Sequence, residues 1–352
     1  MFHRINKAQP ATWRDPKTIQ IGLGSNSVSI SELSLAQQQI IAALYSGVVD
    51  GQQDVLDETF KAEPGTTQSL IEKLTPVSEQ PGYSSNAFGA WQELAFAELA
   101  RAALDYEVNP EMVLAERWQR VVHIDQIDKT GALLAKGLLA SGVGKVVTHD
   151  DGRVLRTDLG ELGFRTANLG NSRYETLNLE LQDLLLPKGF ANRFIDLNYR
   201  PSKDLTMSFA ITVGHLATRP ISYLRWLNRD VPHLNINFDM YQAQISPIIY
   251  PGVTPCLNCL TEGKVDEDPA WPAIASQLLD LPRTRDDSSA LLTATGLALR
   301  VILRALDQSA GFTISSDVEN EFQQGFRIDY SNGNVSRTKH RFHKLCNCRS
   351  LD

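Results

Sequence analysis

The chain contains four cysteines, and their arrangement constrains the fold more than any other feature of the sequence. They form two close pairs that lie far apart along the chain: Cys256 with Cys259, and Cys346 with Cys348. Paired thiolates of this kind are typical of tetrahedral zinc sites. Because four sulfurs fill such a shell, the sequence predicts one structural zinc that ties two distant segments together and leaves no open position for catalysis.

Other interpretations of the cysteines remain open from the residues alone. A turn rich in proline and glycine, residues 251–255, precedes the first pair and favours both thiolates facing one point. The second pair has one intervening residue instead of two, and His340 and His343 lie upstream as alternative ligands. In one alternative interpretation the cysteines are free thiols in loops, and in another Cys256 and Cys259 form a redox dithiol. Neither reading explains the second pair, and a redox pair normally opens a helix, whereas a polar stretch follows here.

Length and composition bound the class of protein. The 352 residues exceed one small core and predict two domains. Hydrophobic residues make up 42% and charged residues 21%, which is typical of soluble globular chains. The net charge of −7 argues against nucleic acid as a partner, because phosphate contacts need clustered Lys and Arg. With neither a signal peptide nor a run of ~20 apolar residues, we expect a cytoplasmic protein without a membrane partner.

The first 80 residues predict a small α+β domain of winged-helix type. Two short strands, at 18–22 and 27–31, precede three segments whose apolar residues recur at helical spacing. Ser34 and Thr66 stand where helix N-caps are expected. The strand at 27–31 is the best candidate for an exposed sheet edge to which a peptide adds a strand.

A linker and a connecting helix are predicted at 81–116, before an α/β domain at 117–352. Prolines, glycine and serines dominate the start of the linker. A strand at 120–124, a helix at 130–139 and a strand at 145–148 then form a βαβ opening, which predicts a mainly parallel sheet. Further strands are predicted at 207–213, 234–238 and 243–250, a helix at 219–227, and a hairpin with strands at 326–330 and 335–340 around an Asn-Gly turn.

These elements and three motifs carry a family resemblance. The motifs are Pro232-His233-Leu234, the PGVTPCLNCL segment at 251–260, and the DPAWPAIASQL segment at 268–278. From Arg117 to the C-terminus the chain resembles the ThiF-like superfamily of ubiquitin-activating-type adenylating enzymes. Over most of its length it resembles the actinobacterial leader-peptide-binding proteins of azole-peptide (TOMM) maturation. The resemblance implies a Rossmann-like ThiF domain with structural zinc, preceded by a winged-helix-like domain.

The same resemblance implies partners. The winged-helix-like domain is expected to bind the leader of a ribosomally made precursor peptide and to present it to a partner modifying enzyme. Relatives pair through their α/β domains, so a homodimer is also expected. The residues themselves do not identify the peptide, and they leave the pathway product open.

The resemblance also places a nucleotide site, from which this sequence departs. The positions matching cofactor contacts are Asp150 or Asp151 for the ribose, and Arg165 and Arg173 for phosphate. The turn at 123–131 has one glycine and two aspartates where relatives keep a Gly-rich phosphate loop. The segment 214–216 lacks the aspartate that holds magnesium in relatives. The sequence therefore predicts a retained fold and lost adenylation, with no catalytic residues and neither ATP nor magnesium required.

Two rival functions belong to other classes. The first is an active adenylating enzyme that uses ATP and magnesium to activate the C-terminal carboxylate of a peptide or carrier protein. The second is a zinc-stabilised regulatory protein whose winged helix contacts DNA, which the negative net charge disfavours.

Overall fold

The computed structural model describes residues 2–24, 27–79, 95–106, 108–184, 193–199, 205–281, 287–313 and 324–349. The backbone divides into two compact units, Met1–Glu116 with Gly311–Ser316, and Arg117–Ala310 with Asp317–Asp352. The start of the predicted linker, residues 81–94, lies outside the described residues.

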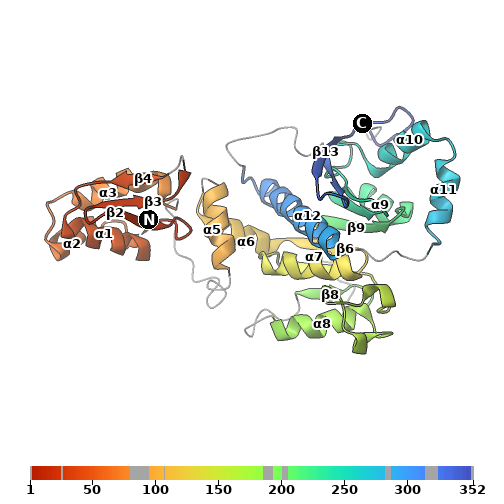
Figure 1. Cartoon of the computed structure of the whole chain (residues 1–352), viewed down its shortest axis with the longest axis horizontal. Coiled ribbons are helices and arrows are strands. Elements are labelled where there is room, and N and C mark those ends of the chain that lie inside the picture. The colour runs from red at the N-terminus through yellow and green to blue at the C-terminus, as the bar shows by residue number, and fades with distance from the viewer. Residues whose placement is uncertain are drawn as a thin grey trace. The chain divides into compact units, whose positions relative to one another are not determined.

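The N-terminal unit is an α+β structure (Figure 1). Its strands are β1 (Phe2–His3), β2 (Ala11–Asp15), β3 (Thr18–Ile21), β4 (Val28–Ile30) and β5 (Val48–Val49). Its helices are α1 (Leu35–Ser46), α2 (Gln53–Phe60), α3 (Thr66–Leu74), α5 (Phe96–Asp105) and α6 (Pro110–Gln119), the last of which runs into the second unit. The strands β2, β3 and β4 form an antiparallel sheet in that order, and β1 pairs with β5.

The predicted strands and helices of this unit are present, with two corrections. Ser34 caps α1 as predicted, in a capping box with Gln37. Thr66 does not cap α3, because Gly65 takes the N-cap position in a left-handed conformation at φ 86°. The carboxylate of the buried Asp57 accepts the N–H groups of Gly65 and Thr67, each at 2.8 Å, and so stabilises this helix start. The sequence patterns also missed β2, since all five of its residues are exposed and show no alternation.

The second unit is built on an eight-stranded mixed sheet with the order β13-β12-β11-β10-β9-β6-β7-β8. Its first strands and helices are β6 (Val121–Ile124), α7 (Lys129–Ala140), β7 (Lys145–Thr148), α8 (Arg173–Leu184), β8 (Phe194–Asp196), β9 (Phe209–His215), α9 (Pro220–Leu227) and β10 (His233–Phe238). The remaining ones are β11 (Gln242–Ile245), α10 (Leu257–Glu267), α11 (Trp271–Leu278), α12 (Ser288–Ser309), β12 (Gln324–Asp329) and β13 (Val335–Lys339).

The sheet is parallel from β8 to β10 and antiparallel from β10 to β13. All residues of β6 and β10 are buried, as expected for parallel strands covered on both faces. Helix α12 packs against α7, β11 and β12 in the main core. The strand predicted at 243–250 ends at Ile245, because Pro247 cannot continue the ladder. The fold class is thus the predicted α/β architecture.

Among the described residues, α12 is long and apolar enough to cross a membrane by length and composition. Half of its apolar window is buried inside the unit. This burial is what a core helix of the sheet requires.

Candidate functional site

The four predicted cysteines come together in the second unit. Their sulfur atoms all lie within 4.8 Å of one another, with Cys256 Sγ 3.5 Å from Cys346 Sγ and Cys259 Sγ 3.5 Å from Cys348 Sγ. Four thiolates about 2.3 Å from one zinc ion place their sulfurs roughly 3.8 Å apart, so the cluster matches a closed tetrahedral shell. The donor set and its burial therefore fit a metal ion such as zinc.

The local structure explains how the two pairs meet. Cys256 is the N-cap of α10 and Cys259 lies in its first turn. The polar stretch after the first pair is therefore a helix, so the sequence argument that this pair does not open a helix was wrong. The second pair follows β13 in the C-terminal segment, where Tyr223, Ile249 and Phe342 pack around the sulfurs. Burial raises the pKa of the Cys348 thiol to about 11, so metal binding must displace protons.

The two upstream histidines are held elsewhere. His343 Nε2 lies 2.9 Å from the Asp266 carboxylate, which joins the C-terminal segment to α10. His340 Nε2 lies 2.9 Å from Thr338 Oγ1. Neither belongs to the sulfur cluster, so the four-cysteine shell is the arrangement that the structure supports.

A second group of polar side chains lies at the carboxyl-terminal ends of β6 and β7, where open α/β sheets bind ligands. The turn between β6 and α7 is closed by its own side chains. Asp128 caps α7, with Oδ1 accepting the N–H of Gly131 at 3.0 Å. A Cβ atom at Gly131 would lie 1.9 Å from the carbonyl oxygen of Gln126. The glycine therefore permits close packing of α7 on the turn, and a carboxylate fills the helix N-terminus.

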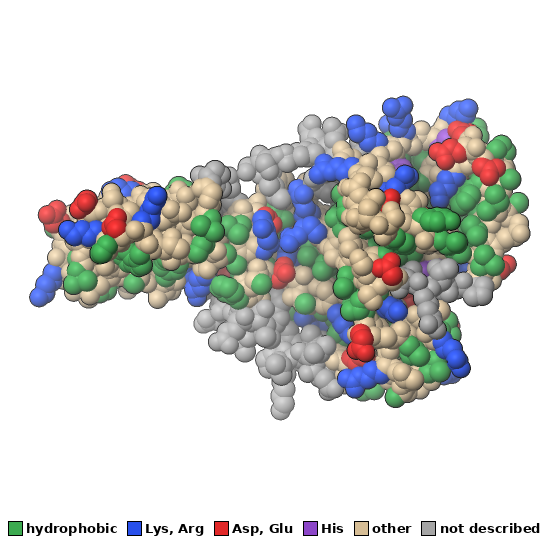
Figure 2. All heavy atoms as spheres, in the orientation of Figure 1, with side chains coloured by type: hydrophobic (Ala, Val, Ile, Leu, Met, Phe, Trp, Pro, Cys, Tyr) green, Lys and Arg blue, Asp and Glu red, His purple; other side chains and the backbone are tan. Residues whose placement is uncertain are grey.

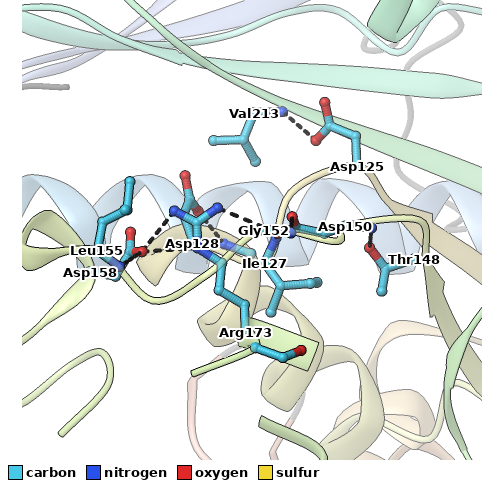
Figure 3. A network of polar contacts seen from close by, with 12 residues as sticks. Asp125, Ile127, Asp128, Thr148, Asp150, Gly152, Leu155, Asp158, Arg173 and Val213 are labelled. Atoms are coloured by element: carbon cyan, nitrogen blue, oxygen red, sulfur yellow. Dashed lines mark hydrogen bonds and ion pairs between the residues drawn. The ribbon is translucent and has the colours of Figure 1, made fainter. Parts of the chain in front are cut away.

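Asp150 and Arg173 lie side by side in this group (Figure 3). Asp150 Oδ2 accepts the N–H of Ile127 at 2.6 Å, and its Oδ1 accepts the N–H of Gly152 at 2.8 Å. Arg173 donates to Asp158 Oδ2 at 2.9 and 2.7 Å and lies 3.5 Å from Asp150 Oδ2. The two predicted contacts thus form an internal brace between the β6–α7 turn and α8.

The other two predicted nucleotide contacts are not part of this brace. Asp151 and Arg165 are both exposed. Asp158, which the sequence reasoning missed, completes the brace and is 2% exposed. The sequence carried no signal for Asp158, because its partner Arg173 lies 15 residues away. The roles assigned to Asp150, Asp151, Arg165 and Arg173 remain predictions.

Asp125 is one of the two aspartates of the 123–131 turn, and its buried environment was not predicted from the sequence. It follows β6, and its Oδ1 accepts the N–H of Val213 at 3.0 Å, while its buried Oδ2 has no hydrogen-bond partner. Burial, with Asp128 nearby, raises the pKa of Asp125 to about 7. His215, which ends β9, donates from Nε2 to Asp128 Oδ2 at 3.0 Å. The edge therefore holds one carboxyl group that titrates near neutrality.

Asp125→Asn is expected to remove part of the pH dependence of stability. The pKa of Asp125 is about 7 in the folded chain against an ordinary value of 3.8, so folding favours the protonated carboxyl. The contribution of the protonated Asp125 carboxyl to stability is therefore complete below pH ~4 and is lost as the pH rises through ~7. The shift corresponds to at most ~4 kcal/mol, and we expect ~2 kcal/mol in the free energy of unfolding. Denaturant unfolding at pH 5 and pH 8 measures it.

Asp151→Asn is the control for this prediction, because the carboxylate of Asp151 is exposed. It should retain the wild-type difference between the two pH values. Parallel pH profiles for wild type and Asp125→Asn would contradict the assignment.

No protein-family model matches the sequence, and no curated protein matches it in a sequence search. Solved structures do match over the whole chain. E. coli MccB with ATP has a TM-score of 0.65 at 13% identity and covers 99% of both chains. The microcin C7 biosynthetic enzyme MccB with N-formylated MccA has a TM-score of 0.66 at 15% identity, covering 99% of this chain and 100% of that chain.

PaaA is a third similar structure, with a TM-score of 0.65 at 14% identity, covering 96% of this chain and 100% of that chain. The three similarities cover 96% to 99% of this chain and therefore extend over both units. These findings confirm the predicted resemblance at the level of the fold. The chain therefore has the fold of MccB and PaaA over nearly its whole length.

Proposed function

We propose that this chain is a non-catalytic ThiF-like scaffold that binds the leader of a ribosomally made precursor peptide and presents it to a partner modifying enzyme. The closed β6–α7 turn carries the non-catalytic part of the proposal. Its backbone donors at Ile127 and Gly131 are already taken by the carboxylates of Asp150 and Asp128. An incoming phosphate would have to displace these hydrogen bonds and approach carboxylates of its own charge.

The peptide-binding part is supported by a similar structure. MccB has been solved in complex with N-formylated MccA, at 15% identity to this chain. We assign the peptide to a recognition domain of winged-helix type at residues 1–80, followed by a linker and connecting helix at 81–116 and the ThiF-like domain at 117–352. A homodimer and a structural zinc at the cysteines complete the proposal.

The leader is proposed to add a strand along β4. This strand pairs with β3 on one side and is an outer strand of the sheet formed by the described residues. Its backbone groups supply affinity to any extended peptide, and its alternating side chains supply selectivity. Val28 and Ile30 are half-buried and pack against the core of the unit, while Ser29 between them is exposed.

Ser29→Pro is expected to weaken binding of the precursor leader by about tenfold or more, because proline removes a backbone donor from the edge strand. Thr12→Pro on β2, the opposite edge of the sheet, is the matched control and should bind as wild type does. Calorimetry with a synthetic leader peptide measures both affinities. Equal binding by the two variants would contradict the assignment to β4.

Hydrogen exchange provides a second readout that requires no variant. The peptide should slow exchange of the amides of β4 and leave β2 unchanged. ATP–pyrophosphate exchange then tests for turnover, and we expect none with or without the peptide. Steady exchange that depends on the peptide would contradict the scaffold function and support an adenylating enzyme.

That alternative has one specific observation in its favour. Asp150 and Arg173, the predicted ribose and phosphate contacts, lie together at the sheet edge, and E. coli MccB has been solved with ATP. In this alternative Asp151 and Arg165 join them, and ATP with magnesium activates the C-terminus of a peptide or carrier protein. A DNA-binding role has no such support, because charged side chains of both signs are interspersed over the visible face (Figure 2).

A further inference from the structure

A group of basic side chains from β6, α9 and the residue after β7 lies near Asp125. His123 in β6 is fully buried, and its Nε2 lies 2.9 Å from His149 Nδ1, directly after β7. Arg225 in α9 approaches the same atom, with Nη2 at 3.5 Å. Its guanidinium lies 4.6 Å from the ring centre of Trp226, against which His123 also packs at 4.5 Å. Three elements therefore converge on one point.

The charge of this group is not balanced locally. Among the described residues, no carboxylate lies within ion-pair distance of Arg225, and its buried Nε has no hydrogen-bond partner. Arg229 follows four residues later, is exposed, and acts electrostatically on Arg225 and on both histidines. Like charges at this spacing repel each other. The arrangement is therefore destabilised until an anion or a protonation change compensates it.

The acids that face the group compensate only in part. Asp125 acts on Arg225 from the end of β6, but its pKa of about 7 leaves it partly neutral. Asp196 acts on His149 from the end of β8, where its Oδ1 accepts the N–H of Asn198 at 2.8 Å. Partial desolvation, with the Arg225 charge, lowers the pKa of His149, although the side chain keeps an exposed edge. The shift favours the neutral imidazole of His149 in the free chain.

The hydrogen-bond chemistry fixes the orientation of the protons. Arginine can only donate, so His123 Nε2 is the acceptor of its contact with Arg225. His149 Nδ1 must then be the donor to the same atom. A second proton on His149 would consequently reside on Nε2, on the ring edge away from this contact. Since His149 is exposed, that proton is available to a ligand.

We propose that Arg225, Arg229 and His149 form a binding site for the anionic oxygen atoms of a phosphate or carboxylate group. The planar guanidinium of Arg225 provides paired donors, and Arg229 and the imidazole add charge at the exposed side. Trp226 and His123 hold the Arg225 side chain in position. The site uses none of the predicted nucleotide contacts, Asp150, Asp151, Arg165 and Arg173, and it does not depend on leader binding.

Sulfate is the first probe, because its charge is constant between pH 5 and pH 8. We expect saturable binding of sulfate. The pKa of His149 should rise when sulfate binds, and NMR of the imidazole ring measures this rise. Sulfate affinity should accordingly fall as the pH increases. Arg225→Gln and Arg229→Gln should each weaken binding by about tenfold. Lys145→Gln removes the same charge at the opposite end of β7 and should leave affinity unchanged.

Two further arms identify the source of the anion. Inorganic phosphate and AMP represent phosphate ligands, and a short peptide with a free C-terminus represents carboxylates, with its C-terminal amide as the control. If one of the two classes binds more tightly than the other, and if Arg225→Gln weakens that binding, the result supports the site and identifies the class of its ligand. Absence of binding by every probe at 10 mM, or equal binding by wild type and Arg225→Gln, overturns the proposal.

Discussion

Replacing Cys256 and Cys259 together with serine is expected to lower the zinc content from one ion per chain to less than ~0.1 and to destabilise the second unit. Two thiolates are lost from a shell of four, and serine hydroxyls do not replace them as zinc ligands. The remaining pair, Cys346 and Cys348, cannot hold a tetrahedral ion alone. Metal analysis and thermal unfolding of the purified chain measure the two effects.

A matched variant separates the metal from general damage near it. His343→Gln breaks the hydrogen bond to Asp266, but it removes no sulfur from the cluster. It should therefore keep one zinc per chain, and its C-terminal segment should stay protected from protease. Zinc content that survives in the double serine variant, or that is lost in His343→Gln, would contradict the four-cysteine site.

Asp307→Ala is expected to lower the free energy of unfolding of the second unit by about 3 to 5 kcal/mol. Asp307 near the end of α12 accepts two hydrogen bonds from Arg117, at 2.7 and 2.6 Å, and both residues are at most 3% exposed. The variant leaves a guanidinium in the core without its carboxylate. Denaturant unfolding compared with wild type gives the difference.

Two comparisons sharpen this second test. Glu180→Gln removes the carboxylate of the ion pair with Lys136, whose side chains are 32% and 25% exposed, and should cost less than ~1 kcal/mol. The double variant Arg117→Met with Asp307→Leu should be more stable than Asp307→Ala, because it removes the buried guanidinium together with the carboxylate to which it donates. If Asp307→Ala and Glu180→Gln lower the free energy of unfolding by the same amount, the buried pair of Arg117 and Asp307 does not stabilise the unit as its geometry indicates.

The sequence predicts the centre of the large unit well because its signals are local. Helix α7 and strand β7 begin and end within one residue of the predicted ranges, since the glycines at 142 and 144 and the β-branched Val146 and Val147 mark that boundary. The hairpin of β12 and β13 forms around the Asn-Gly turn as predicted. The two cysteine pairs were also readable, because ligand spacing is itself a local pattern.

Contacts between distant segments were not predictable in the same way. The role of Asp125 depends on the backbone of Val213, 88 residues away. Whether Asp150 and Arg173 face a ligand or each other depends on Asp158, for which the sequence carries no pattern. Helix α10 was missed because its residues are mostly polar, and it packs few of them into a core. Side-chain partners across the sheet are decided by the fold as a whole.

The distance along the chain between the two cysteine pairs has a consequence for the unfolded state. Cys256 and Cys346 are separated by 90 positions, a segment that contains α10, α11, α12, β12 and β13. A bound ion would close this segment into a ring, and keeping a ring of that size closed in the unfolded chain would cost an entropy worth about 4 to 5 kcal/mol. The ion is therefore released as the chain unfolds, and its binding free energy adds to the stability of the native state. Chelation would remove this contribution without requiring any change in the native packing of α12.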